Sequence, residues 1–119
     1  MSDKEAVSSA LAGCATVVHT SALHAPHETS HNEEQFREVN VAGTSAVLDP
    51  GCRAVVHCST TSLLINQRVV EAERAGRIPW LDEEDRHVVP ARNKYRRSKQ
   101  DAEKLCREFG QDVARLTVQ

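Results

Sequence analysis

The sequence predicts an α/β protein whose strands form a parallel sheet flanked by helices. Short apolar runs rich in β-branched residues alternate along the chain with longer segments of helical spacing. These runs are apolar throughout, which is typical of parallel strands buried on both faces rather than of half-exposed antiparallel strands. With 119 residues and 39% hydrophobic content, the chain has the size of one ordinary domain. We therefore predict a single domain over residues 1–119.

The first half of the chain predicts two helices around one strand. Residues 4–13 have helical spacing and end at a glycine, and the run "ATVVHT" (15–20) follows as a short strand. The stretch "SALHAPHETSHN" (21–32) is interrupted by Pro26 and predicts a loop. Asn32 is suited to cap a second helix, which runs from about Glu33 toward Leu48 and stops at "DPG".

The second half predicts two further strands and a third helix. The run "RAVVHCST" (53–60) is apolar and β-branched, and an irregular stretch with Pro79, Trp80 and Pro90 extends from it to about residue 92. The segment "NKYRRSKQDAEKLC" (93–106) predicts a helix that ends at Gly110. The run "DVARLTV" then provides a last strand.

Composition and charge exclude several classes of partner. The 15 basic and 17 acidic residues are mixed along the chain and give a formal charge of −2, so we expect no nucleic-acid partner. The N-terminus lacks the order of a signal peptide, and no apolar run is long enough to span a bilayer. We expect a cytoplasmic protein without a membrane partner. The scattered cysteines predict buried thiols rather than disulfides or metal ligands: Cys14, Cys52, Cys58 and Cys106.

Tyr95 and Lys99 form the most informative pair in the sequence. They lie four residues apart in the predicted third helix and therefore share one face of it. An ammonium beside a phenol favours the ionised phenol, which can then exchange protons in catalysis. An ordinary helix face carries the same spacing by chance. The preceding strand ends in "HCSTTS", and open parallel sheets bind ligands beyond the carboxyl ends of their strands.

Four motifs in a fixed order carry a resemblance to a known family. The chain shows "VVHTSA", "VNVAGT", "VVHCSTTS" and "YRRSK" in that order, with "WLDEE" between the last two. This series resembles the extended short-chain dehydrogenase/reductase family, which contains NAD(P)-dependent epimerases, dehydratases and reductases. The resemblance extends over nearly the whole chain, and it implies a Rossmann-like sheet.

The resemblance also implies a role for each matching residue. Tyr95 corresponds to the catalytic acid/base, and Lys99 to the residue that lowers its pKa and holds the nicotinamide ribose. Thr60 corresponds to the hydroxyl that binds the substrate oxygen, with Thr61 as the alternative if the register slips by one. Asn40 matches a helix asparagine whose role is structural. The lining beside the cofactor, NAD or NADP, would include Thr20, Ser21, Ala22, Tyr95 and Lys99.

The implied chemistry is hydride transfer to or from a carbinol or ketone carbon, in an oxidoreductase or isomerase. The substrate would be a small molecule such as a sugar nucleotide. In the resembling family, the two helices that correspond to those around Asn40 and Tyr95 commonly pair with their copies. The resemblance therefore implies a homodimer.

The sequence also departs from the family pattern. Its five glycines are never closer than eight residues, so no glycine-rich loop for a pyrophosphate can form among them. The chain begins after the position of that loop and stops at "RLTVQ", before the usual substrate-binding region. We therefore expect a middle segment, truncated at both ends, which binds cofactor weakly or not at all and is inactive alone. The alternative is a non-catalytic remnant or protein-interaction module that binds no cofactor.

Other polar residues have simpler interpretations. His24, His27 and His31 share a loop with Glu28, where a metal site is conceivable but a solvated polar loop is favoured. His19 and His57 sit late in apolar strands and are interpreted as core histidines with satisfied hydrogen bonds. The basic run "KYRRSK" with Arg92 suggests either a phosphate patch or a solvated helix face, and the acidic residues that follow favour the solvated face.

Overall fold

The computed structural model describes residues 3–48, 52, 54–81, 90–112 and 116–118. Its sheet has three parallel strands in the order β1-β2-β3: β1 (Thr16–His19), β2 (Ala54–His57) and β3 (Leu116–Val118). In the register of β1 and β2, Val17 lies beside Val55 and His19 beside His57. The predicted α/β class and the parallel sheet are therefore confirmed.

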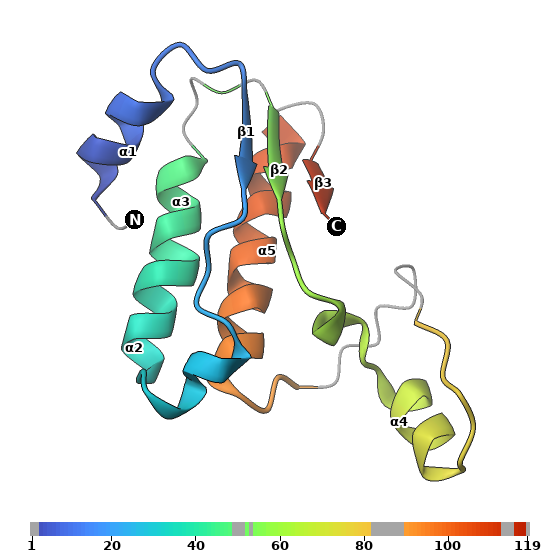
Figure 1. The fold of residues 1–119 in the computed structure, drawn as a ribbon. Helices are drawn as coiled ribbons and strands as arrows, with labels where there is room; N and C mark the ends of the chain where they lie inside the picture. The colour runs from blue at the N-terminus through green and yellow to red at the C-terminus, as the bar shows by residue number, and fades with distance from the viewer. Residues whose placement is uncertain (1–2, 49–51, 53, 82–89, 113–115, 119) are drawn as a thin grey trace.

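Two long helical segments lie side by side on one face of the sheet (Figure 1). The first is continuous through α2 (Glu33–Phe36), the π-helical turn η2 (Arg37–Ala42) and α3 (Gly43–Val47). Asn32 begins this segment as predicted, because its side chain accepts from the Gln35 N–H while the Gln35 side chain accepts from the Asn32 N–H. The second is α5 (Lys94–Asp112), which packs against η2 and α3.

The helices bury one face of the sheet only, as far as the described residues show. The core cluster joins Val47, Cys52 and Val55, and Val7 and Leu11 of α1 (Lys4–Leu11) pack against it. On the other face, Val18 is 66% exposed. The expectation of strands buried on both faces is therefore wrong for the described part of the chain.

Several predicted element bounds are corrected by the structure. The loop after β1 contains the 3-10 turn η1 (Ala25–Thr29), and β2 ends at His57 rather than at residue 60. The stretch predicted as irregular holds the 3-10 turn η3 (Thr61–Leu64) and the helix α4 (Gln67–Arg74). Helix α5 continues through Gly110, because a single glycine weakens a well-packed helix without ending it. The predicted strand residues 53 and 113–115 lie outside the described residues.

The sequence contains residues that favour both ends of helix α4. The Asn66 side chain accepts from the Val69 N–H at its start, and Gly76 follows its end with φ of +67°. The helix and the segment after it project away from the sheet (Figure 1). In the segment after α4, Ile78 and Trp80 are 88% and 91% exposed.

Two of the four cysteines differ from their predicted environment. Cys52 and Cys106 are buried, whereas Cys14 and Cys58 are exposed, and all four are free thiols. Cys14 precedes β1 and Cys58 directly follows β2, so both lie just outside the strands. Within the described residues, no helix is both long enough and apolar enough to span a bilayer.

Val55→Ala and Val18→Ala test the one-sided sheet with the same change on opposite faces. Val55→Ala should lower the free energy of unfolding by about 2 kcal/mol, because two buried methyl groups are lost and a cavity remains. Val18→Ala should lower it by less than about 1 kcal/mol, since the side chain is already solvated. Urea titration monitored by circular dichroism measures both. Equal losses would show that the outer face is covered in solution.

Candidate functional site

Tyr95 and Lys99 lie one turn apart on α5, close to the carboxyl ends of β1 and β2. Lys99 is 3% exposed, and its Nζ donates to the main-chain oxygen of Cys58, directly after β2, at 2.5 Å. Burial lowers the pKa of Lys99, while the nearby Cys58, Cys106 and Glu103 side chains act to raise it. The helix therefore presents a desolvated ammonium at the sheet edge where ligands of open parallel sheets bind.

A pair of buried histidines lies beside this ammonium. The rings of His19 and His57 have centroids 5.4 Å apart, because the two residues are register partners in adjacent strands. Burial lowers the pKa of His19, and the Lys99 charge lowers it further. Burial, Lys99 and then His19 lower the pKa of His57 to about 4, against the weaker opposing effect of Glu103. Both imidazoles are therefore neutral at physiological pH.

The two histidines differ in hydrogen bonding. His19 Nε2 lies 3.1 Å from Thr44 Oγ1, and that hydroxyl donates to the Asn40 main-chain oxygen. Since the hydroxyl proton is used in this way, His19 donates to it through Nε2–H. Both ring nitrogens of His57 are buried without a partner among the described residues. The prediction of satisfied core histidines thus holds for His19 and is wrong for His57, whose register partner His19 turns its Nε2 to Thr44 instead.

Asn40 connects three parts of the site. Its Oδ1 accepts from the Leu23 N–H at 2.7 Å, and its Nδ2 donates to the Leu23 oxygen at 3.0 Å and to Ser98 Oγ at 2.8 Å. Ser98 Oγ in turn donates to the Tyr95 main-chain oxygen. The buried amide therefore ties the loop after β1 to α5 within one turn of Tyr95. Nothing in the sequence pattern points to Ser98 except its place beside Lys99.

Tyr95 lies at the start of α5 against the loop after β1. Its backbone N–H donates to Glu28 Oε1 at 2.9 Å, and its ring lies 6.4 Å from the His24 ring. The neighbouring Lys94 Nζ donates to the main-chain oxygens of Glu28 and His31, each at 2.7 Å. These contacts fix the first turn of α5 relative to η1. The loop histidines thus help to build the surroundings of Tyr95.

The hydroxyl residues after β2 have distinct partners. Thr60 caps η3: its Oγ1 accepts from the Ser62 N–H and donates to Ser62 Oγ. Thr61 is the first residue of η3 and is exposed, while Ser59 Oγ donates to Glu103 Oε2 on α5 at 2.8 Å. The hydrogen bonds of the Thr60 hydroxyl among the described residues are thus local to its turn, although η3 packs against α5.

The predicted cofactor lining Thr20–Ala22 directly precedes Leu23, the residue that Asn40 holds. Thr20 and Ser21 are exposed and Ala22 is half-buried. Their backbone thus lies just beyond the end of β1, at the same sheet edge as the Cys58 oxygen. The segment therefore lies at the strand ends where Lys99 meets the Cys58 oxygen.

The basic run 94–99 is not a uniformly solvated helix face. Arg96, Ser98 and Lys99 are buried, and Arg97 forms a two-point ion pair with Glu33. The interpretation as a solvated face is wrong, because α2, η2 and η3 pack against successive sides of this turn.

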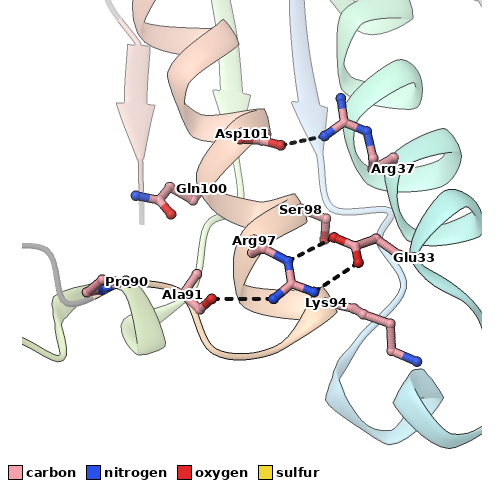
Figure 2. Close-up of a pocket in the computed structure, with 9 residues that line it drawn as sticks. All are labelled: Glu33, Arg37, Pro90, Ala91, Lys94, Arg97, Ser98, Gln100 and Asp101. Carbon is pink, nitrogen blue, oxygen red and sulfur yellow. Dashed lines mark hydrogen bonds and ion pairs between the residues drawn. The ribbon is translucent and has the colours of Figure 1, made fainter.

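A shallow cavity of about 300 Å³ lies between α5 and the first turns of the α2–η2 segment, on the side away from the sheet (Figure 2). Two ion pairs cross it, Arg97 with Glu33 and Arg37 with Asp101. Each guanidinium there already has a carboxylate partner. Lys94 also lines the cavity, and its Nζ is held by the main-chain oxygens of Glu28 and His31. Lys99 is not among the lining residues, so the cavity is separate from its ammonium.

Among the described side chains, no group of three or more histidine, cysteine, aspartate or glutamate residues has the geometry to hold a metal ion. In the loop after β1, His27 Nδ1 accepts from the His24 N–H, and His31 Nδ1 lies 2.8 Å from Ser30 Oγ. These histidines interact with their own loop.

Sequence and fold comparisons agree with this geometry. Residues 1–113 match the 3-beta hydroxysteroid dehydrogenase/isomerase family. The chain belongs to this family. It is an extended short-chain dehydrogenase/reductase family, so the sequence-based resemblance is confirmed. We find no significantly similar sequence among curated proteins.

Two solved structures share the fold. A putative epimerase from Burkholderia cenocepacia J2315 is 25% identical, with a TM-score of 0.69 over 98% of this chain and 35% of that one. A short-chain dehydrogenase/reductase superfamily protein from Agrobacterium tumefaciens with bound NAD is 24% identical, with a TM-score of 0.69 over 98% of this chain and 34% of that one. The fold of this family member is therefore Rossmann-like, and the chain spans about a third of the length of these structures.

The neutral histidine pair predicts acid destabilisation. The pKa of His57 in the folded chain, about 4, lies below the ordinary value of 6.5, so the unfolded chain binds the proton first as the pH falls. The stability from the neutral ring is complete above about pH 6.5 and is lost progressively down to about pH 4. The shift corresponds to about 3 kcal/mol.

His57→Leu should therefore flatten the fall of unfolding free energy between pH 6.5 and 4, measured by urea titration at several pH values. His24→Leu, at an exposed histidine, is the matched control and should leave the slope unchanged. A slope of unchanged size in His57→Leu would show that other groups, His19 or the carboxylates, cause the acid sensitivity instead of His57.

Proposed function

We propose that this chain carries the catalytic residues of an NAD(P)-dependent epimerase, dehydratase or reductase. The observation that carries the proposal is the desolvated Lys99 ammonium, held on the Cys58 oxygen one turn from Tyr95. A phenol near such a cation ionises more readily than in water. Tyr95 then serves as the acid/base that exchanges a proton with the substrate oxygen, and Lys99 stabilises its anion.

The remaining residues of the site have supporting roles in this proposal. Asn40 positions the Thr20–Ala22 backbone through Leu23 and the Tyr95 turn through Ser98. Thr60 binds the substrate oxygen once its hydroxyl turns away from Ser62, and Thr61 is the alternative. The substrate is a small molecule with a carbinol or ketone carbon, such as a sugar nucleotide.

The residues of this chain fit one end of a nicotinamide dinucleotide. Lys99 and the Thr20–Ala22 backbone meet at the sheet edge, where they would hold the nicotinamide ribose, and the bound cofactor would accept or supply the hydride. Among the described residues, nothing matches the glycine-rich cradle that a pyrophosphate requires. The positive-φ glycines of the described residues, Gly13 and Gly76, follow the ends of α1 and α4 rather than opening a helix after a strand.

We propose that the 119 residues by themselves are inactive, because only part of the cofactor contact is present. The alternative is a non-catalytic interaction module, and the missing glycine cradle favours it for the isolated chain. We further propose that the chain forms a homodimer through the outer surfaces of the α2–α3 segment and α5. The two ion pairs that cross these helices keep their surfaces in a fixed relation.

Calorimetric titration of the isolated chain should detect weak or no binding of NAD or NADP. The pyrophosphate contacts at a helix N-terminus are missing from these residues, and so is their share of the affinity. A micromolar dissociation constant for either dinucleotide would contradict the proposed division of contacts.

The catalytic roles require a chimera in which a related enzyme supplies a glycine-loop segment upstream and a substrate region downstream. In it, Tyr95→Phe should lower kcat by about 100-fold or more with little change in cofactor affinity, because only the proton-exchanging oxygen is lost. Lys99→Ala should impair both kcat and cofactor affinity. Thr60→Val should have a smaller effect on kcat, since one hydrogen bond is removed.

Lys104→Ala provides the control, since this lysine lies exposed on the same helix and should leave the kinetics unchanged. Steady-state rates and cofactor titrations separate the two effects. Equal activity of the Tyr95→Phe chimera and its parent would show that Tyr95 and Lys99 are only part of an ordinary helix face and not catalytic.

A further inference from the structure

Arg96 is a buried cation that no anion neutralises among the described residues. It is 8% exposed, and its Nη2 donates to the Ile65 main-chain oxygen at 2.8 Å. Its Nε is fully enclosed and has no acceptor in the described part of the chain. Burying a guanidinium with a single neutral acceptor is costly, because the lost hydration is only partly replaced.

Other arginines on the same surfaces show what a compensated guanidinium looks like here. Arg97 pairs with Glu33, Arg107 with Glu103, and Arg37 with Asp101. The charged group that acts on Arg96 is instead Arg92, of like sign, and together with burial it lowers the pKa of Arg96. Arg96 therefore lies near a second positive charge, whereas Arg97, Arg107 and Arg37 each lie beside a carboxylate.

The position of Arg96 connects this charge to the candidate site. Arg96 directly follows Tyr95 in the first turn of α5, a helix of 19 residues whose N-terminus is the positive end of its dipole. Ile65 follows η3, the turn that Thr60 caps. Arg96 therefore lies between the first turn of α5 and the segment that leaves β2.

We propose that Arg96, assisted by Arg92, binds an oxyanion, either a phosphate or a carboxylate group. A planar guanidinium with N–H donors to spare can bind such a group at two points, and the neighbouring Arg92 adds attraction. The first backbone N–H groups of α5 are already taken by Glu28 and Asn93, so the attraction comes from the side chains. If the oxyanion is part of the substrate, this inference rests on the proposed function. The affinity of Arg96 for a free oxyanion does not depend on that function.

Thermal unfolding of the full chain in phosphate, acetate and chloride at equal ionic strength tests the site. Phosphate, acetate or both should raise the Tm relative to chloride. Phosphate also stabilises folded proteins without a specific site, so the informative quantity is the part of the Tm increase that Arg96→Met lacks. If only phosphate gives such a part, the ligand is a phosphate group, and if acetate gives an equal part, it is a carboxylate. Identical Tm values in all three salts would overturn the proposal.

Arg96→Met assigns the effect to this side chain. Without oxyanion it should raise the Tm, because an uncompensated buried charge is removed, and it should weaken oxyanion binding by about tenfold or more. Arg96→Lys keeps the charge without the two-point geometry and should bind with intermediate affinity. An oxyanion-dependent Tm increase of the same size in Arg96→Met and the parent would refute the site.

Two further variants separate this inference from the catalytic proposal. Arg107→Met removes an exposed guanidinium that is paired with Glu103 and should leave the oxyanion effect intact. Tyr95→Phe should also leave it intact, because the phenol oxygen takes no part in charge neutralisation. Loss of the effect in Arg107→Met would show diffuse surface binding and would contradict the assignment to Arg96.

Discussion

The burial of the Lys99 ammonium is the constraint on which the rest of the site depends. A cation that is 3% exposed requires acceptors, and the carbonyl after β2 provides one. Burial lowers the pKa of both His19 and His57, and the same charge lowers it further, so both imidazoles stay neutral. The ends of two strands and one helix are therefore fixed around a single positive charge, one turn from Tyr95.

Asn40 gives this arrangement its rigidity. Both polar groups of its amide are used, and they join the chain after β1 to Ser98 on α5. The residue lies in the π-helical turn between α2 and α3, where an additional residue in the turn changes which side chains face the sheet edge. All these contacts come from the helix-covered face and the carboxyl edge. The site geometry is thus formed without any contact from the exposed sheet face that carries Val18.

The sequence predicts the main framework because its signals are local and strong. The apolar runs become β1 and β2, and Asn32 begins its helix as a capping residue should. Its failures arise where tertiary packing or short capping signals decide the outcome. Helix α4 was missed although Asn66 and Gly76 mark its ends, because Pro79 and Pro90 made the whole stretch read as irregular. The exposed outer face was unpredictable, since an apolar strand has the same sequence whether or not a helix covers it.

The basic run on α5 shows why the chemistry of a site needs the structure. Successive helical residues turn by about 100°, so four nearby cations point to different surroundings. Lys94 reaches main-chain oxygens of the loop after β1, and Arg97 reaches a carboxylate on α2. Lys99 enters the core beside the strand ends, and Arg96 is enclosed against the segment after η3. A count of charges along the sequence assigns all four to one solvated face, whereas the packing of three different segments around one helical turn gives each cation a different electrostatic role.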